Sequence, residues 1–370
     1  MKIQIDRKSF AKALSEVTPF APAKAAISVL KYAKFTTNGK SLTIEANDTQ
    51  CSMVKEVLMN ECDEDGSFLL EIADLNKFIA KTKGDTVEIH IDNGSAIVKH
   101  TKGTAEYPVL DAKDFPVFSM PKENLKELEI KPAILAEAIN KAKGFVATDT
   151  IRPQMGAIYA YFEMGDKIGF CASDTHRLIH IWFDTEMSDK ENFNWLIMPM
   201  AFNAIVNACK TAETVKIQIS GKHVSYRLGD TLIQTVQANG AFPNFQRVIP
   251  STWVMECAVD KFDLMDALGR VALFCDKTEC VKISISRMDM TLQVNNMDFM
   301  KKSTETLVHG GCSGEIKIGV SVSNLLAALG AFDGGEILMK FTDESKPILF
   351  GQQGVDKLQV IAMPLQLIEG

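Results

Sequence analysis

The first residues whose types and spacing could do chemistry are His176 and His180, in the segment DTHRLIH. On a helix, two histidines four residues apart lie on one face and can bind a metal ion. The neighbouring sequence favours a strand instead, because IGFCAS precedes the pair and IHIWF continues after it. A strand places both imidazoles on one sheet face, with no other ligand nearby in the sequence. We interpret them as ordinary hydrogen-bonded histidines and predict no metal site.

Other catalytic patterns are absent from the sequence. It contains no GxxxxGK[ST] phosphate loop, no GxSxG nucleophile elbow and no HExxH zinc motif. The eight cysteines form no CxxC pair, which is typical of buried thiols in a reducing cytosol. No apolar run reaches the roughly 18 residues of a membrane span, and the start MKIQIDRKSF lacks an apolar signal core. We expect a cytoplasmic, non-enzymatic protein without cofactor or membrane contact.

Composition sets the size and class of the protein. The chain has 370 residues, of which 46% are hydrophobic and 24% charged, so two or three ordinary globular domains are expected. The formal net charge of −7 argues against a generic nucleic-acid binder. It leaves open a binder whose basic residues are segregated onto one surface.

A helical pattern occurs three times along the chain. The windows Ile5–Phe20, Ile130–Phe145 and Val259–Phe274 align without a gap. Their apolar residues coincide at the spacing i, i+3, i+4, i+7, which marks one face of an amphipathic helix. Each window follows a short alternating strand such as KIQI or ELEI.

A second element recurs in the same order, at residues 69–91, 196–219 and 317–341. Each segment reads as strand, helix, polar turn and strand, and Asp74 and Ser323 are the expected N-caps of two of the helices. The remaining segments alternate in polarity between turns such as Asn38-Gly39, which indicates antiparallel sheet. Chance amphipathicity would not repeat two different elements in one order. We predict an α+β protein of three tandem copies of a two-helix, antiparallel-sheet domain.

Two proline-punctuated connectors separate the copies. DFPVFSMP covers residues 114–121 and AFPNFQRVIP covers residues 241–250. The predicted domains are therefore residues 1–123, 124–250 and 251–370.

The predicted helices carry clustered lysines. Lys12 lies in the first helix of copy one, Lys77 and Lys81 in its second helix, and Lys141 in the first helix of copy two. Repeat proteins usually present extended surfaces, and a basic helical face on an acidic body would bind phosphates without reading sequence. The alternative is that these lysines only solvate their helices.

Three short motifs at matching places resemble one family. SDTHRL at residues 173–178, FPNFQRVIP at 242–250 and AMPLQL at 362–367 are similar to segments of the bacterial DNA polymerase III β subunit, the β sliding clamp. The resemblance covers the whole chain and keeps its domain order. It implies a head-to-tail homodimer, a six-domain ring whose helices line a hole around double-stranded DNA, and a tether for the replicative DNA polymerase.

The resemblance also implies further partners and residue roles. A clamp loader, other polymerases and repair proteins with short Leu/Phe motifs would bind a pocket between the second and third domains. The implied pocket residues are Met155, Ser173, Thr175, His176, Arg177, Leu178, Pro243, Arg247, Val248, Ile361, Met363, Pro364, Leu365 and Leu367. The implied DNA contacts are Lys24 and Arg152, to which Lys12, Lys77, Lys81 and Lys141 are added from the helix charges. The implied dimer contacts are Phe78, Leu273 and Phe274.

Several positions depart from the family pattern. Thr175 and Gln366 stand where the family commonly has Gly and often has Arg, respectively, and a tail at residues 368–370 follows the usual last leucine. Met200 and Ala201 replace a basic stretch that the family can show. Two alternatives remain: a β-rich multi-domain scaffold that binds no nucleic acid and, more remotely, an enzyme.

Overall fold

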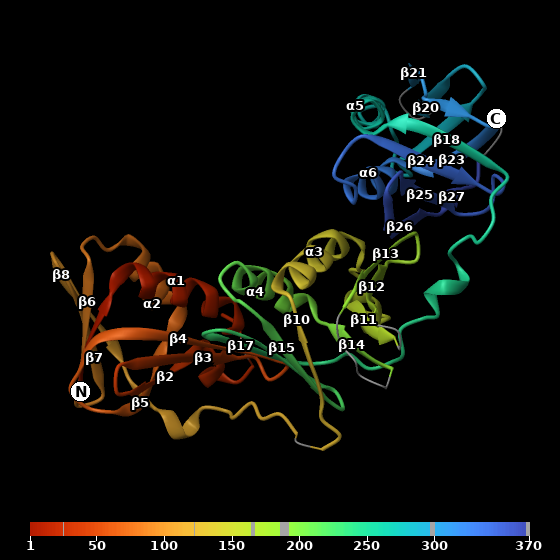
Figure 1. Ribbon diagram of the computed structural model, residues 1–370. Helices are drawn as coiled ribbons and strands as arrows, with labels where there is room; N and C mark the ends of the chain where they lie inside the picture. Colours follow the sequence, from red (N-terminus) through yellow and green to blue (C-terminus); the bar gives the residue numbers. More distant parts are fainter. Residues whose placement is uncertain (25, 122, 164–166, 186–191, 297–299, 368–370) are drawn as a thin grey trace. The chain divides into compact units, whose positions relative to one another are not determined.

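The computed structural model describes residues 1–370 except 25, 122, 164–166, 186–191, 297–299 and 368–370 (Figure 1). The tail at 368–370 therefore lies outside the described residues. The chain forms two compact units, one of residues 1–136 with 200–237 and one of residues 137–199 with 238–370. Among the described residues, no helix has the length and apolar character needed to cross a membrane.

The repeated helices occur where the periodicity predicts them. The first helix of each copy is α1 (Arg7–Val17), α3 (Pro132–Ala142) or α5 (Lys261–Ala272). The second is α2 (Ile72–Lys81), α4 (Pro199–Cys209) or α6 (Val322–Gly330). Two different helices in one order, three times, confirm the predicted repeat.

Capping and an apolar face explain the first helices. In α1, the Asp6 carboxylate accepts a hydrogen bond from the Ser9 backbone N–H at 2.7 Å, and in α5 Asp260 accepts from Phe262 and Asp263. Such caps satisfy N–H groups that the helix leaves free. Four residues at the i, i+3, i+4, i+7 positions of α1 are buried, namely Phe10, Ala13, Leu14 and Val17.

The predicted N-caps of the second helices were wrong. Helix α2 begins directly after Glu71, so Asp74 lies in its first turn and pairs with Lys77 at 2.9 Å. Helix α6 is capped by Ser321, whose hydroxyl accepts from Asn324 N–H at 3.4 Å, and Ser323 lies inside the helix. In both cases the strand runs into the helix without a turn, which moves the helix start towards the N-terminus.

One sheet of 13 strands organises the first unit. Its main path runs β10-β15-β16-β17-β4-β1-β6-β7-β8, and β2, β3, β5 and β9 attach beside it. All of the recorded pairings are antiparallel, as the alternation predicts. The strands are β1 (Lys2–Asp6), β2 (Tyr32–Asn38), β3 (Ser41–Asn47), β4 (Cys51–Cys62), β5 (Gly66–Glu71), β6 (Thr86–Asp92), β7 (Ser95–His100), β8 (Gly103–Pro108), β9 (Leu110–Asp111), β10 (Lys126–Ile130), β15 (Val215–Ser220), β16 (His223–Leu228) and β17 (Thr231–Val236).

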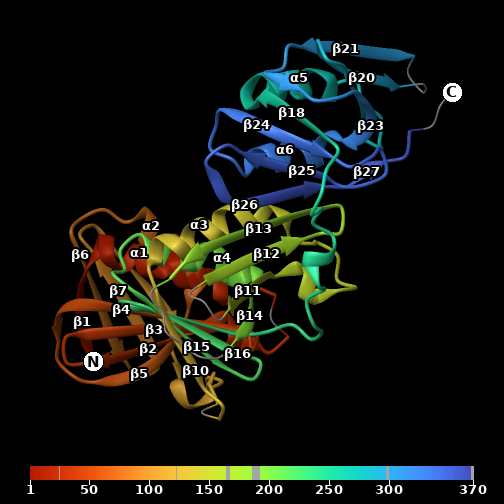
Figure 2. The same cartoon turned by 45° about the vertical axis from the view of Figure 1, so that its right-hand side comes forward.

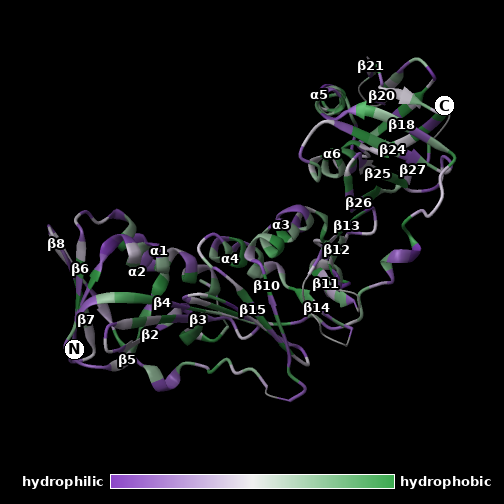
Figure 3. Ribbon diagram, in the orientation of Figure 1, coloured by the Kyte–Doolittle hydropathy of each residue, from purple (hydrophilic) through white to green (hydrophobic). Residues whose placement is uncertain are grey.

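Two sheets organise the second unit. A nine-stranded sheet has the order β14-β11-β12-β13-β26-β25-β24-β18-β22, and a five-stranded sheet has the order β21-β20-β19-β23-β27. Hydrophobic and polar residues alternate along many of these strands (Figure 3). The strands are β11 (Ile158–Glu163), β12 (Lys167–Ser173), β13 (Arg177–Asp184), β14 (Phe193–Ile197), β18 (Met255–Asp260), β19 (Cys280–Ile285), β20 (Met290–Asn296), β21 (Lys301–Leu307), β22 (Gly311–Cys312), β23 (Ile316–Ser321), β24 (Glu336–Phe341), β25 (Ile348–Gln352), β26 (Val355–Ala362) and β27 (Pro364–Leu365).

Equivalent strands join consecutive copies. Strand β4 is the third strand after α1 and pairs with β17, the third strand after α4. Strand β13 is the third strand after α3 and pairs with β26, the third strand after α6 (Figure 2). Two equivalent strands take no part in these junctions. They are β21, the third strand after α5, and β8, the third strand after α2. Each lies at the end of its sheet and, within the described chain, pairs with one neighbour only.

Candidate functional site

The turn between β12 and β13 is built by one carboxylate. Asp174 accepts hydrogen bonds from the backbone N–H groups of His176 at 3.0 Å and Arg177 at 2.9 Å. Its second oxygen accepts from Arg177 Nε at 2.9 Å. The Arg177 guanidinium in turn lies 5.6 Å from the ring centroid of Phe145. The segment SDTHRL thus forms a fixed turn that leaves Thr175 and His176 exposed.

The last described residues pass beside this turn. The Met363 backbone N–H donates to the His176 carbonyl at 2.7 Å, just after β26 ends its pairing with β13. The chain then pairs with β23, where Leu365 opposes Gly319. A Cβ on Gly319 would lie 2.8 Å from both the Leu365 carbonyl oxygen and Leu367 Cδ2. Glycine at this position therefore allows the terminal segment to pack closely against β23. Met363, Pro364, Leu365 and Leu367 remain half-buried.

Aromatic side chains form a floor beneath these segments. Phe242 stacks on Tyr159 with ring centroids 5.0 Å apart, and the buried Phe245 lies 5.9 Å from Tyr161. Phe245 also packs in one cluster with Leu178 and Ile361. The connector AFPNFQRVIP is therefore fixed to β11 by its two phenylalanines, and it leaves Pro243, Arg247 and Val248 exposed.

The predicted pocket residues thus divide into a floor and a rim. Met155, Ser173, Leu178 and Ile361 are buried, and the structure links Leu178 with Ile361 and His176 with Met363 directly. Leu365 and Leu367 lie instead against β23. Sequence reasoning missed five floor residues: Tyr159, Tyr161, Phe242, Phe245 and Leu349. The two phenylalanines of AFPNFQRVIP and the alternation of IYAYFE were the available signals.

The interpretation of His180 as a hydrogen-bonded histidine is confirmed. The Tyr161 hydroxyl donates to His180 Nε2 at 2.7 Å, and His180 Nδ1 donates to Gln359 Oε1 at 3.3 Å. Burial lowers the pKa of this imidazole, which keeps it neutral in that role. His176 lies in the turn and not on the strand, so the two rings do not share a sheet face.

Thr175 adopts a backbone conformation that disfavours it. Its φ is +79°, in the left-handed region where a β-branched residue is strained and glycine is not. Its N–H is held by the Ser173 hydroxyl at 3.1 Å, so the turn imposes this conformation.

We predict that Thr175→Gly raises the free energy of unfolding by about 1 kcal/mol, because it relieves left-handed strain. Denaturant unfolding of the full chain measures this. Thr252→Gly is the matched control, since Thr252 is exposed and lacks a positive φ. The control should lose stability, and an equal loss in Thr175→Gly would contradict the strain argument.

The residues predicted to contact DNA differ in how exposed their side chains are and in whether they already have partners within the chain. Lys12, Lys24, Lys77, Lys81 and Arg152 are exposed. Lys12 and Lys77 form surface ion pairs, to Glu16 at 3.9 Å and to Asp74 at 2.9 Å, which are weak. The Lys141 side chain is 16% exposed and its ammonium lies 3.1 Å from the Ala331 carbonyl and 3.4 Å from Asp333. Lys141 is therefore already engaged within the chain.

The predicted dimer residues belong to, or directly follow, helices near the two end strands: α5 packs against β21, and Phe78 of α2 lies near β8. Leu273 follows α5 and is 81% exposed, and Phe274 is half-buried. Phe78 on α2 makes edge-on contacts with the rings of His100 at 5.7 Å and Tyr107 at 6.3 Å. His100 ends β7 and Tyr107 belongs to β8, so Phe78 packs next to the sheet edge.

Comparison with known families decides the classification. Residues 1–119, 129–244 and 246–366 match the N-terminal, central and C-terminal domains of the DNA polymerase III beta subunit, respectively. The chain belongs to the DNA polymerase III beta subunit family. It is a sliding clamp, a non-catalytic processivity factor of DNA replication.

Individual relatives agree over the full length. The beta sliding clamps of Treponema pallidum and Caulobacter vibrioides are 26% and 25% identical, over 99% of this chain and 100% of theirs. A sliding clamp structure from Pseudomonas aeruginosa bound to griselimycin superposes with a TM-score of 0.94 at 20% identity, covering 99% of this chain and 100% of that one. The Bacillus subtilis clamp structure gives 0.91 at 20% identity, covering 100% of both chains. The structural likeness establishes the three-domain clamp fold.

Proposed function

We propose that two copies of the chain pair head to tail into a closed ring around duplex DNA and hold the replicative polymerase on its template. The observation that carries this proposal concerns β21 and β8. In the described chain, each ends its sheet and lacks the second neighbour that its equivalents have in the internal junctions. The internal junctions β4–β17 and β13–β26 use equivalent strands, and β21 and β8 are the equivalent strands that end their sheets in the described chain. Antiparallel pairing of β21 with the partner's β8 would repeat the same junction.

Such a contact joins different surfaces of the two copies, so it closes only if its rotation closes. Three domains per chain and two chains give six domains joined by one kind of junction. A long edge strand that stays exposed can pair with other chains and cause aggregation. Pairing of β21 with β8 of the partner would cover both edges. We place the domain boundaries at residues 123/124 and 250/251, which lie within a few residues of the ends of the family matches.

DNA would be held by exposed cations and not by base reading. Lys24, Arg152 and the helix lysines Lys12, Lys77 and Lys81 present side chains suited to phosphate. Contacts of this kind are sequence-independent and weak, which suits a ring that slides. The net charge of −7 then resides on other surfaces and limits unspecific binding.

Partners would bind where the β12–β13 turn, the AFPNFQRVIP connector and the terminal segment meet. We propose that the replicative polymerase, the clamp loader and other replication and repair proteins insert Leu and Phe side chains there. The exposed Arg247 is available to the peptide backbone or to acidic flanks, and Met363 adapts its shape to different anchors. One shared surface makes these partners compete.

Topological retention tests the ring. The wild-type chain, after loading, should remain on closed circular DNA through a high-salt wash and should leave once the circle is linearised. Sedimentation should give a dimer mass. Loss from closed circles at the same rate as from linear DNA would contradict encirclement and favour a scaffold without a topological hold.

We predict that Lys24→Ala with Arg152→Ala weakens DNA binding modestly and leaves the dimer intact. The slope of log affinity against log salt should fall by roughly one unit for each phosphate that the variant no longer neutralises. Lys216→Ala with Arg227→Ala is the matched control, because both residues are exposed on paired sheet strands. Equal salt slopes for the two double variants would contradict the assignment of Lys24 and Arg152.

A further inference from the structure

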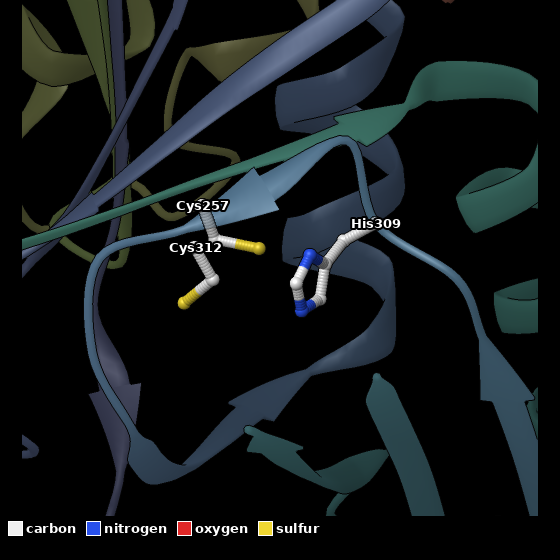
Figure 4. Close-up of side chains that lie close together, drawn as sticks. All are labelled: Cys257, His309 and Cys312. Atoms are coloured by element: carbon white, nitrogen blue, oxygen red, sulfur yellow. The ribbon is translucent and has the colours of Figure 1, made fainter. Parts of the chain in front are cut away.

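A cluster of soft ligands lies in the third copy, apart from every residue discussed above. Cys257 on β18, Cys312 on β22 and His309 just before β22 lie close together (Figure 4). Their ligand atoms, the two sulfurs and an imidazole nitrogen, all lie within 4.8 Å of one another. Among the described residues, this is the one group of three or more side chains with metal-binding atoms at such distances.

Strand pairing brings the two sulfurs together. Cys257 and Cys312 are directly opposite each other in the β18–β22 pair. The flanking backbone bonds run from Gly310 N–H to Ala258 O at 2.7 Å and from Ser313 N–H to Glu256 O at 3.0 Å. The cysteines therefore occupy a position without mutual backbone bonds, where opposed side chains approach most closely.

His309 is held with its other nitrogen free. Its Nε2 lies 2.9 Å from the Ser286 carbonyl, which only accepts hydrogen bonds, so Nε2 carries the proton. Nδ1 is then an acceptor, and it is buried with no hydrogen-bond partner in the described part of the chain. Figure 4 shows the Cys257 sulfur pointing towards this ring. Metal-binding histidines typically have this arrangement, in which the second ring nitrogen donates to a backbone carbonyl.

We propose that Cys257, Cys312 and His309 Nδ1 bind a zinc ion. Two thiolates and one imidazole are a preferred zinc ligand set, and zinc–sulfur bonds of about 2.3 Å place tetrahedral ligand atoms roughly 3.8 Å apart. The present separations of up to 4.8 Å close with small side-chain rotations. Binding releases the two thiol protons and replaces the bond that Cys312 Sγ now donates to the Gly314 carbonyl at 2.9 Å.

The fourth position has a candidate as well. The Glu336 carboxylate lies directly over Gly310, where a Cβ would meet it at 2.0 Å, and its charge contributes to the raised pKa of Cys257. Gly310 is the residue after His309. The site would take either this carboxylate or water as its fourth ligand, and it would clip β22 onto the edge of the nine-stranded sheet.

Two other chemistries of the same residues are less well supported. A reactive nucleophile needs a low thiol pKa, whereas burial and the neighbouring Cys312 raise the pKa of Cys257 to about 12. A disulfide would use both sulfurs but leave His309 Nδ1 buried without a partner. A metal ion would use all three side chains and would give His309 Nδ1 the partner that it lacks in the described part of the chain.

The test is zinc titration of the full-length chain, reduced and metal-free, in competition with a chromophoric chelator. Wild type should bind one zinc ion per chain. His309→Gln and Cys312→Ser should each weaken binding by more than about a hundredfold, beyond the effect of removing a hydrogen-bonding neighbour of a ligand. Cys62→Ser is the matched control, because Cys62 is also half-buried and its thiol donates to the carbonyl two residues on, at 3.2 Å.

Cobalt substitution keeps the proposal testable if a variant fails to fold. Co²⁺ bound to wild type should show the thiolate charge-transfer and tetrahedral absorption bands expected for two sulfur ligands. Absence of those bands overturns the proposal. Zinc affinity that is equal in wild type and in folded His309→Gln or Cys312→Ser also overturns it, as does a Cys257–Cys312 disulfide that persists in mild reductant.

Discussion

Replacing Leu273 and Phe274 together by alanine is expected to convert the dimer into a folded monomer. Leu273 is 81% exposed in the isolated chain, so its removal costs the monomer little. If α2 of the partner, with its Phe78, buries both side chains, each of the two contributes roughly 3–5 kcal/mol to the contact. A loss of about 6 kcal/mol corresponds to more than 10⁴-fold in dimer affinity.

Analytical ultracentrifugation at low micromolar concentration measures this change. Leu58→Ala with Met288→Ala is the control, because these side chains are 73% and 81% exposed and lie outside the proposed contact. The control should remain a dimer, and both variants should keep the circular dichroism spectrum of wild type. A dimer in the Leu273/Phe274 variant would refute this assignment of the contact.

The effect on DNA follows from the same contact. An open monomer retains its exposed lysines, so it should still bind linear DNA weakly in low salt. It should not remain on closed circles after a salt wash. A variant that loses retention on circles but keeps weak binding to linear DNA shows that retention is topological and not electrostatic.

The helices were predictable because their signal is local. Phe10, Ala13, Leu14 and Val17 share one face within three turns, and the same spacing returns in the other copies. The pairing of β4 with β17 was not predictable in this way, since period-two alternation tells which face of a strand is buried but not which strand lies beside it. The start of α2 was missed for a related reason, because a strand that continues into a helix leaves no turn residue to read.

The candidate site was only partly predictable. Motifs that resemble the clamp family locate the Asp174 turn and the terminal segment, and the departure of Thr175 from the family's usual glycine marks the position whose φ is positive. The aromatic floor required knowing that Tyr159 and Phe242, far apart in sequence, are neighbours. Cys257 and His309 are separated by about 50 residues with no spacing pattern, so only the β18–β22 pairing reveals their cluster.

Met363→Ala with Leu365→Ala is expected to weaken partner-peptide binding strongly while the dimer and its retention on DNA persist. A short Leu/Phe peptide should bind wild type with a micromolar dissociation constant, about −8 kcal/mol, since the contact is small and the peptide must become ordered. The two half-buried side chains supply apolar area for those anchors. Their loss should weaken binding by at least about a hundredfold, or roughly 3 kcal/mol.

The point variants are preferable to deleting residues 363–370 because Leu365 and Pro364 pair with β23. The deletion removes that pairing and exposes the buried strand, so a loss of cooperative unfolding would reflect the fold and not the partner site.

Fluorescence anisotropy of a labelled peptide measures the affinity, and Leu58→Ala with Met288→Ala again serves as the control. Polymerase stimulation should fall together with peptide binding. Unchanged peptide affinity in a folded Met363/Leu365 variant would show that partners bind elsewhere, because both residues belong to the terminal segment that the third domain contributes to the proposed surface.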